Sequence, residues 1–314
     1  MTSFSCNLIV PVRVRLRLCS PATTMSHTSL LLVVLAAIAH ATWNLLAKRA
    51  AMVGPMFVFA YGLAASLLYA PWMIWVLLDE GMTWSWPVAL CILASSLLHL
   101  GYSLCLQRGY QVADLSVVYP IARGTGPLLS TMGAFMLLNE TATTSGVAGM
   151  LCVVGGVLLI ATQGKLAMFR SPHAWIGVRW GGVIGLFIAA YTVVDAYGVK
   201  TLLIMPVVFD WFTCATRTLM MTPHVMQRRK QYFAAMRGHW HLAIGVGLLS
   251  PLGYILVLYA LRMGAPLNLV APAREMSMML GTLAGMFLLR EKVGPGRLAG
   301  CGAILAGVIL LGSS

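Results

Sequence analysis

The sequence predicts an all-α membrane protein with ten transmembrane helices arranged as a 5+5 inverted repeat. The first indication is composition: of 314 residues, 60% are hydrophobic and only 9% are charged, whereas soluble domains carry about a quarter charged residues. The second is a series of apolar segments long enough to cross a bilayer, and the third is a correspondence between the two halves of the chain. A soluble fold of this length does not bury so much apolar surface, so the chain is expected to cross a membrane many times.

Ten apolar segments have the length of a membrane span. A bilayer core of about 30 Å is crossed by about 20 helical residues, and windows of that length identify the candidates. The predicted spans cover residues 29–50, 54–78, 86–107, 114–138, 145–162, 174–199, 201–222, 239–261, 266–289 and 296–312. The longest connection, about residues 222–239, is basic and is expected to be a surface loop.

The two halves of the chain match at a nearly constant offset. The pairs separated by 151 residues are His40 with Tyr191, Asn44 with Asp195, Arg123 with Arg274, Glu140 with Glu291, and Gly156 with Gly307. Each half holds five predicted spans, and an odd number makes the second copy enter the membrane with the opposite orientation. Such inverted repeats place a substrate site near the midplane, where the halves meet.

The predicted boundaries follow from this repeat. Residues 26–162 form the first five-helix repeat and residues 174–312 the second. Residues 1–25 form an N-terminal tail that has no apolar stretch long enough for a signal peptide. Met25 directly precedes the first span, so residues 1–24 are interpreted as an over-extended start; a short, disordered basic tail is the alternative.

The net charge of +13 does not indicate nucleic-acid binding, because the basic residues lie in short loops between apolar segments. That position is typical of contacts with anionic lipid headgroups and of topology signals. The loops after the odd-numbered spans carry most of them: Lys48, Arg49, Arg108, Lys165, Arg170, Arg228, Arg229, Lys230, Arg237, Arg290, Lys292 and Arg297. This excess predicts that these loops are cytoplasmic and that both termini are external.

No catalytic, metal or cofactor site is indicated. The seven cysteines form no CxxC pair, so neither a disulfide framework nor a metal site is expected. HExxH and nucleotide-binding glycine motifs are also missing from the sequence. The glycines at helical spacing are interpreted as helix-packing surfaces instead: Gly177, Gly181 and Gly185; Gly281 and Gly285; Gly296 and Gly300.

Arg123 is the most informative residue of the membrane segments. It lies about 14 Å into its predicted span, where a charge is costly and is expected to face protein or a water-filled cavity. Tyr119 and Arg123 share one helical face, and Pro120 and Pro127 are expected to loosen the backbone around them. Two interpretations stay open: a structural arginine neutralised by an acidic neighbour, or an anchor for a carboxylate or phosphonate of a substrate.

Polar residues of three other spans complete the candidate binding site. Arg274 and Glu275 lie in the ninth span, where Arg274 either repeats the role of Arg123 or is neutralised by Glu275. His40 and Asn44 share a face of the first span, and their repeat partners Tyr191 and Asp195 share a face of the sixth. Asp195 and Glu275 are the deep carboxylates that would carry protons if transport is proton-coupled.

Two further groups of polar residues are weaker candidates. Asp210, Cys214 and Arg217 share one face of the seventh span, and an internal ion pair between the aspartate and the arginine is expected. His99, Tyr102 and Tyr254 lie in the third and eighth spans and are secondary candidates for the site.

Four motifs, in this order, resemble the EamA-like branch of the drug/metabolite transporter (DMT) superfamily: "HATWNLLAK", "VVYPIARGTGPLLS" through "LLNE", "AAYTVVDAYGVK" and "LNLVAPAREMSMMLGTLAGMFLLREK". The resemblance implies ten helices in a 5+5 inverted repeat around a central cavity. It also implies movement of small metabolites, commonly amino acids or related compounds and often outward, driven by protons or by the substrate's own gradient. Members commonly have cytoplasmic termini, which is opposite to the loop-charge prediction, and the orientation stays open.

The expected function is that of a secondary transporter. It would move a small anionic or zwitterionic metabolite, such as an amino acid or a phosphonate, across the bacterial inner membrane by alternating access, with efflux as the expected direction. The expected partners are this substrate, the lipid bilayer and protons as a candidate coupling ion; a monomer is consistent with the repeat, and the oligomeric state stays open. The alternative is a membrane-embedded enzyme acting on a lipid headgroup, which would need clustered catalytic groups near one interface.

Overall fold

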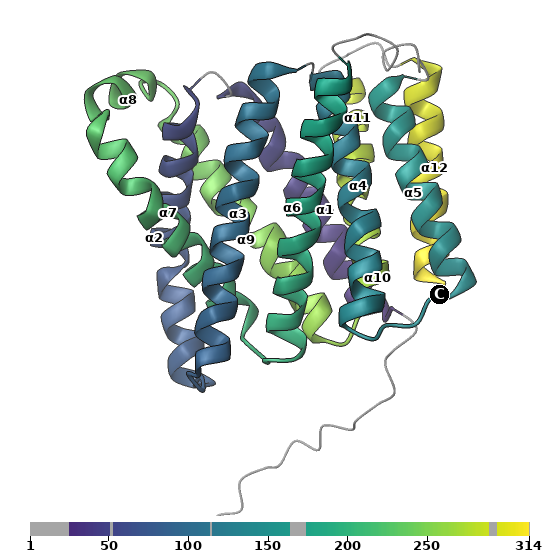
Figure 1. Ribbon diagram of the computed structural model, residues 1–314, viewed down its shortest axis with the longest axis horizontal. Coiled ribbons are helices and arrows are strands. Elements are labelled where there is room, and N and C mark those ends of the chain that lie inside the picture. The colour runs from purple at the N-terminus through teal and green to yellow at the C-terminus, as the bar shows by residue number, and fades with distance from the viewer. Residues whose placement is uncertain (1–24, 51–52, 114, 164–173, 289–293, 314) are drawn as a thin grey trace, which may run out of the picture.

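The computed structural model describes residues 25–50, 53–113, 115–163, 174–288 and 294–313. Within these ranges all regular structure is helical, and the helices run roughly side by side (Figure 1). The first repeat contains α1 (His27–Arg49), α2 (Pro55–Asp79), α3 (Trp86–Val112), α4 (Leu115–Leu137) and α5 (Thr144–Thr162). The second contains α6 (Ala174–Lys200), α7 (Pro206–Gln227), α8 (Arg229–Ala235), α9 (Trp240–Arg262), α10 (Leu267–Ala273), α11 (Met276–Leu288) and α12 (Pro295–Gly312).

The helices correspond to the ten predicted spans with two differences. The short helix α8 lies within the basic segment that was predicted to be a loop. The predicted ninth span, residues 266–289, is not one helix but two, α10 and α11. Seven of the described helices, namely α1, α2, α3, α5, α6, α9 and α12, are individually long and apolar enough to cross a membrane.

The packing of the helices follows the inverted repeat. At the sequence offset, α1, α2 and α3 correspond to α6, α7 and α9, α4 corresponds to α10 with α11, and α5 corresponds to α12. α1 packs on α9, and their counterparts α6 and α3 also pack together; α2 packs on α9 as α7 packs on α3. α2 also packs on α7, and α5 packs on α12; in each of these pairs the two helices are counterparts of one another in the repeat. The protein is therefore an all-α membrane protein built as a 5+5 inverted repeat.

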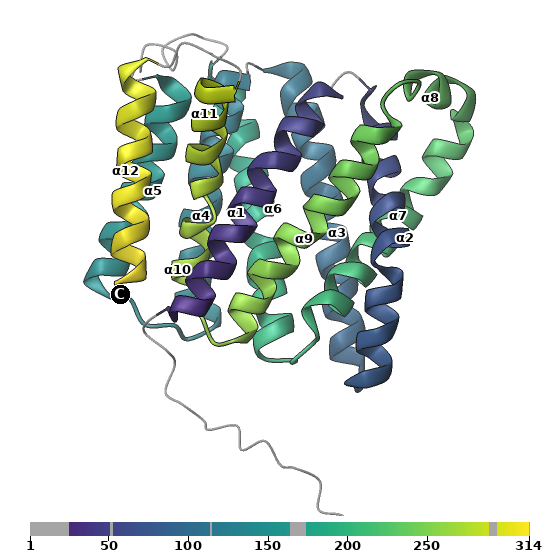
Figure 2. The same ribbon diagram turned by 180° about the vertical axis from the view of Figure 1, so that it is seen from behind.

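The two membrane faces differ in what they carry. The ends of the described chain lie on one face, together with the connections from α2 to α3, α4 to α5, α6 to α7 and α9 to α10 (Figures 1 and 2). We call this the terminal face. The opposite face, called the basic face, carries α8 and the exposed residues Arg49, Arg108, Arg228, Arg229, Lys230 and Arg237.

α5 and α12 cross at glycines that occupy equivalent positions in the two repeats. A Cβ atom added to Gly156 would lie 2.7 Å from the carbonyl oxygen of Gly300, and one added to Gly300 would lie 2.7 Å from the carbonyl oxygen of Gly156. Gly149 and Gly307 make the same reciprocal contact, at 2.9 and 2.7 Å. The backbones approach this closely because neither helix has a side chain at the crossing.

Gly156→Ala is expected to destabilise the folded protein by about 1–3 kcal/mol, the usual range for overpacking. The added Cβ would meet backbone atoms of α12, which cannot rotate away as a side chain can. Gly155→Ala is the matched control, because nothing lies within 4 Å of its added Cβ, and alanine favours a helix. Thermal unfolding in one detergent compares the two variants; equal melting temperatures would contradict the close crossing.

The glycine pattern of α6 also forms a packing surface. Cβ atoms at Gly177 and Gly181 would lie 2.8 Å from Val117 Cγ1 and 2.6 Å from Ile121 Cβ, and Gly185 likewise faces α4. This confirms the interpretation of these three glycines and fixes α4 beside α6. The same interpretation is wrong for Gly281, which has nothing within 4 Å of an added Cβ.

Candidate functional site

A central cavity of about 120 Å³ lies among helices of both repeats. This is well above the ~10–15 Å³ that one water needs. Its wall is formed by α1, α2, α3 and α4 of the first repeat, by α6, α7 and α9 of the second, and by the junction between α10 and α11. The histidine, arginine and aspartate side chains of the wall are His40, His99, Arg123, Asp210, Arg217 and Arg274, and the tryptophan and tyrosine side chains are Trp43, Tyr61, Tyr102, Tyr191 and Tyr254.

The structure places four of the eight predicted site residues on the cavity wall: His40, Arg123, Tyr191 and Arg274. The other four lie beside or behind them. Asn44 Nδ2 donates to the carbonyl oxygen of His40 at 2.7 Å, and the ring centroid of Tyr119 lies 6.0 Å from Arg123 Cζ. Asp195 and Glu275 are each 1% exposed and bind residues of the wall.

Arg123 joins the two repeats. Its Nε atom lies 2.8 Å from Glu275 Oε2, and its NH2 group donates to Ser277 Oγ at 3.0 Å. These contacts connect the middle of α4 to the start of α11. The acidic partner required by the structural interpretation is therefore present, and it is Glu275, the neighbour of the repeat-related Arg274.

Arg274 lies between α10 and α11, where the helix that would cross the membrane is interrupted. α10 ends one residue before it and α11 begins two residues after it, and the hydrogen bonds between them tighten: Glu275 N donates to the carbonyl oxygen of Pro272, and Met278 N to that of Glu275, both at 2.9 Å. Pro272 contributes to the break because proline lacks an N–H and crowds the preceding turn. α4 stays one helix despite Pro120 and Pro127, so the repeats differ here.

No acidic side chain of the described residues lies within ion-pair distance of Arg274. Only three side-chain ion pairs occur among the described residues: His99 with Asp195, Arg123 with Glu275, and Lys200 with Glu140. Arg274 is 6% exposed and lines the cavity. Its Nε atom has no hydrogen-bond partner among these residues. A buried guanidinium facing a cavity is suited to bind an anionic group.

Asp195 of α6 is held by two side chains of other helices. His99 Nε2 lies 3.1 Å from Asp195 Oδ2, and the Tyr254 hydroxyl donates to the same oxygen. The His99 ring stacks on Tyr191, with 4.0 Å between centroids and 25° between planes. The structure thus joins His99 and Tyr254, secondary candidates from the sequence, to two of the main ones.

The predicted ion pair within α7 is wrong. Asp210 and Arg217 both line the cavity but are not among the three ion pairs of the described chain. Seven helical residues separate their Cα atoms by about 10.5 Å along the axis. The Arg217 guanidinium instead contacts Cys214 Sγ, at 3.8 Å. Two opposite charges of α7 therefore face the cavity separately.

Glu140 makes a second connection between the repeats, at the terminal face. Its Oε1 atom accepts from Lys200 Nζ at 2.6 Å and from Leu267 N at 2.7 Å, and its Oε2 atom accepts from Asn268 N at 2.9 Å. It thereby satisfies the free N–H groups at the start of α10. We call Glu140 with its three partners, Lys200, Leu267 and Asn268, the terminal latch. In the sequence, Glu140 stood out because the motif "LLNE" that it ends is repeated as "LLRE" at Glu291. Glu291 itself lies outside the described residues.

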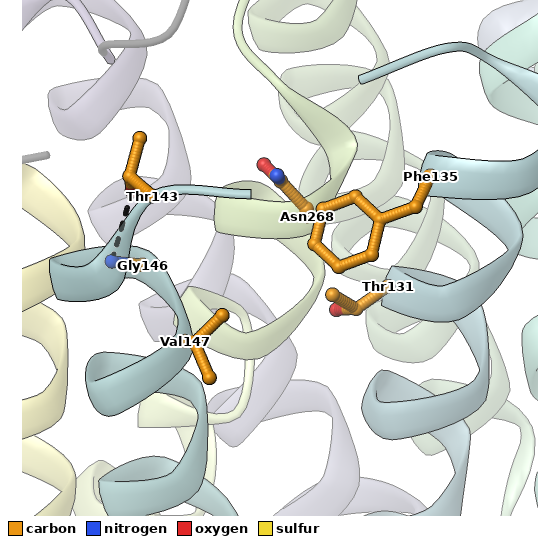
Figure 3. A pocket seen from close by; sticks show the side chains of 6 residues that line it. All are labelled: Thr131, Phe135, Thr143, Gly146, Val147 and Asn268. Carbon is orange, nitrogen blue, oxygen red and sulfur yellow. Dashed lines mark hydrogen bonds between the residues drawn. The ribbon is translucent and has the colours of Figure 1, made fainter. Parts of the chain in front are cut away.

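A crevice between α4, α5 and α10 lies beside the latch (Figure 3). Thr143 Oγ1 accepts from Gly146 N at 3.0 Å and caps the start of α5, while Asn268 and Phe135 form the opposite wall. The crevice has about 0 Å³ of space for a water-sized molecule. It is not a second binding cavity, so the candidate site is the central one.

Comparison with known proteins now assigns the chain to a family. The model of the EamA-like transporter family matches residues 27–162 and again residues 175–313. The chain belongs to the EamA-like transporter family. The two matches fall on the two structural repeats.

Similar proteins are consistent with this family. Two curated relatives are the multidrug resistance protein EbrB of Bacillus subtilis (strain 168), 34% identical over 85 residues, and that of Bacillus atrophaeus, 33% identical over 85 residues. Each alignment covers 26% of this chain and 68% of the relative. A solved crystal structure of a protein with 16% identity superposes with a TM-score of 0.69 over 90% of this chain and 96% of its own; this likeness shows the fold. This EamA-like protein is thus a membrane transporter.

Proposed function

We propose that this EamA-like protein is a secondary transporter that exports a small anionic or zwitterionic metabolite across the bacterial inner membrane by alternating access. The observation that carries the proposal is Arg274, a buried cation without an ionic partner among the described residues, on the wall of a cavity between two inverted repeats. Both relatives are named multidrug resistance proteins, which favours the outward direction.

The substrate's acidic group would bind Arg274. A guanidinium offers a planar pair of donors that matches a carboxylate or phosphonate at two points. The aromatic walls, which include Tyr191 and Tyr254, provide apolar surface for the rest of a small molecule. Arg123 is the weaker choice for this role, because Glu275 already neutralises it.

The difference between the repeats supports alternating access. α4 is continuous, whereas its counterpart is divided into α10 and α11 at the position of Arg274. The terminal latch joins α10 to the first repeat at the terminal face. In an inverted repeat, exchanging the two conformations between the halves moves the opening from one face to the other.

Proton coupling is proposed through Asp195 rather than Glu275. Glu275 is paired with Arg123, whereas Asp195 contacts no arginine and is held by a histidine, which can itself carry a proton, and by a tyrosine hydroxyl. A proton on Asp195 would weaken its contact with His99, which stacks on the cavity residue Tyr191. Protonation and substrate binding would thereby be connected.

Arg274→Gln is expected to reduce transport of anionic substrates by about tenfold or more, because a hydrogen-bonded charge contributes about 1.5–3 kcal/mol. The measurement is flux into proteoliposomes across a panel of amino acids, simple carboxylates and organophosphonates. Arg237→Gln on the basic face, where Arg237 is exposed, is the matched control and should transport normally. Normal anion flux in well-folded Arg274→Gln would exclude Arg274 as the anion site.

A further inference from the structure

The α7 wall of the cavity carries a second charged position that the proposed anion site does not use. Asp210, Cys214 and Arg217 follow the spacing of one helical face, and all three line the cavity. Contacts with α2 fix this orientation of α7: Trp211 Nε1 donates to the carbonyl oxygen of Ser66 at 2.8 Å. In addition, a Cβ added to Gly62 would lie 2.5 Å from Thr218 Oγ1. The face cannot turn away without breaking this packing.

Asp210 is a cavity carboxylate with no basic side chain of the described residues at ion-pair distance. Neither Arg217 nor any other described basic side chain forms an ion pair with it. An ionised side chain inside a membrane is costly and usually faces a partner or a water-filled site. The partner of Asp210 is therefore expected to enter the cavity from outside.

Asp210 and Arg274 lie at similar depths. Both α7 and α10 begin at the terminal face (Figure 1). Asp210 is four residues past the first residue of α7, and Arg274 is seven past that of α10, which corresponds to about 6 and 10 Å along the helix axes. A negative and a positive side chain thus occupy two walls of one small cavity at nearly the same level.

The other two carboxylates near the cavity, Asp195 and Glu275, already have partners. Asp195 binds His99 and Tyr254 through one oxygen and is 1% exposed. Glu275 is also 1% exposed and is paired with Arg123. Among the described residues, Asp210 is the carboxylate that lines the cavity and remains available for a cation.

We propose that Asp210 binds a positively charged ammonium group of the transported molecule, so that the substrate is a zwitterion whose acidic end lies at Arg274. This inference rests on the proposed function and narrows its substrate class from anions or zwitterions to zwitterions. Arg217, two turns deeper in α7, acts on the Asp210 charge only from beyond ion-pair distance and so does not occupy the carboxylate. Tyr61 and Tyr102 also line the cavity, and aromatic faces attract cations.

Matched ligands test this assignment on the wild-type protein. The full chain in lipid nanodiscs is titrated calorimetrically with the twenty amino acids, with their desamino carboxylic acids and with their decarboxylated amines. The tightest-binding amino acid should bind at least tenfold more tightly than its own desamino acid. Equal affinities, or binding of the acids alone, would overturn the role of Asp210 while leaving the anion site at Arg274 in place.

Two variants then separate the charged ends. Asp210→Asn should weaken binding of the amino acid and the amine at least tenfold and leave the desamino acid within about twofold; Arg274→Gln should weaken the amino acid and the acid and spare the amine. Asp79→Asn, an exposed carboxylate at the end of α2, is the matched control. Unchanged amino-acid affinity in Asp210→Asn overturns the inference, whereas unchanged acid affinity in Arg274→Gln overturns the proposed function. The wild-type comparison decides the question if Asp210→Asn does not fold.

Discussion

Arg123→Gln is expected to reduce the amount of folded protein, with a loss of about 3–5 kcal/mol, because removing one partner leaves a buried charge behind. That charge is Glu275, which is 1% exposed and has Arg123 as its ion-pair partner. The same change removes the hydrogen bond to Ser277 and with it the second connection between α4 and α11. Monodispersity and thermal unfolding in detergent measure the loss.

A double variant separates the structural role from a role in binding. Arg123→Gln together with Glu275→Gln removes both charges and should recover much of the stability lost in the single variant. Arg123→Lys keeps the charge but not the planar donor pair and should fall between the two. Normal folding of Arg123→Gln combined with lost substrate affinity would instead identify Arg123 as a substrate anchor.

The sequence contains enough to predict the architecture. Composition and window length give the spans, and matched residues such as Arg123 and Arg274 reveal the repeat. The break between α10 and α11 was not predictable in the same way, because prolines occur in both copies: Pro120 in α4 and Pro272 in α10. Contacts from elsewhere in the chain differ between the copies. Glu140 binds the start of α10, and Arg123 binds Glu275 beyond the break.

The sequence predicted several residues of the candidate site, but not which side chains contact one another. Helical spacing predicted His40, the repeat predicted Arg274, and both line the cavity wall. It could not show that Glu275 pairs with an arginine of the other repeat, or that His99 and Tyr254 bind Asp195, since these partners are far apart in sequence. The expected ion pair in α7 failed because residues on one helical face can still be two turns apart.

Glu140→Gln is expected to open the terminal face and to reduce net transport by more than tenfold. A neutral amide cannot replace the carboxylate that accepts from Lys200, Leu267 and Asn268 together. Because these contacts join the repeats, their loss should shift the balance between the two access states; each 1.4 kcal/mol of difference changes that balance about tenfold. Glu80 directly follows α2, which ends at the same face, and its carboxylate is exposed, so Glu80→Gln is the matched control.

A cysteine on the cavity wall allows the shift between the two access states to be measured. Cys214 lines the cavity wall on α7, so a chain retaining Cys214 as its single cysteine can be labelled with a membrane-impermeant thiol reagent applied to one face at a time in oriented proteoliposomes. Alternating access predicts that Glu140→Gln raises the labelling rate from the terminal face at least tenfold and lowers the rate from the basic face. Rates that rise together from both faces, or that do not change, would contradict alternating access controlled by the terminal latch.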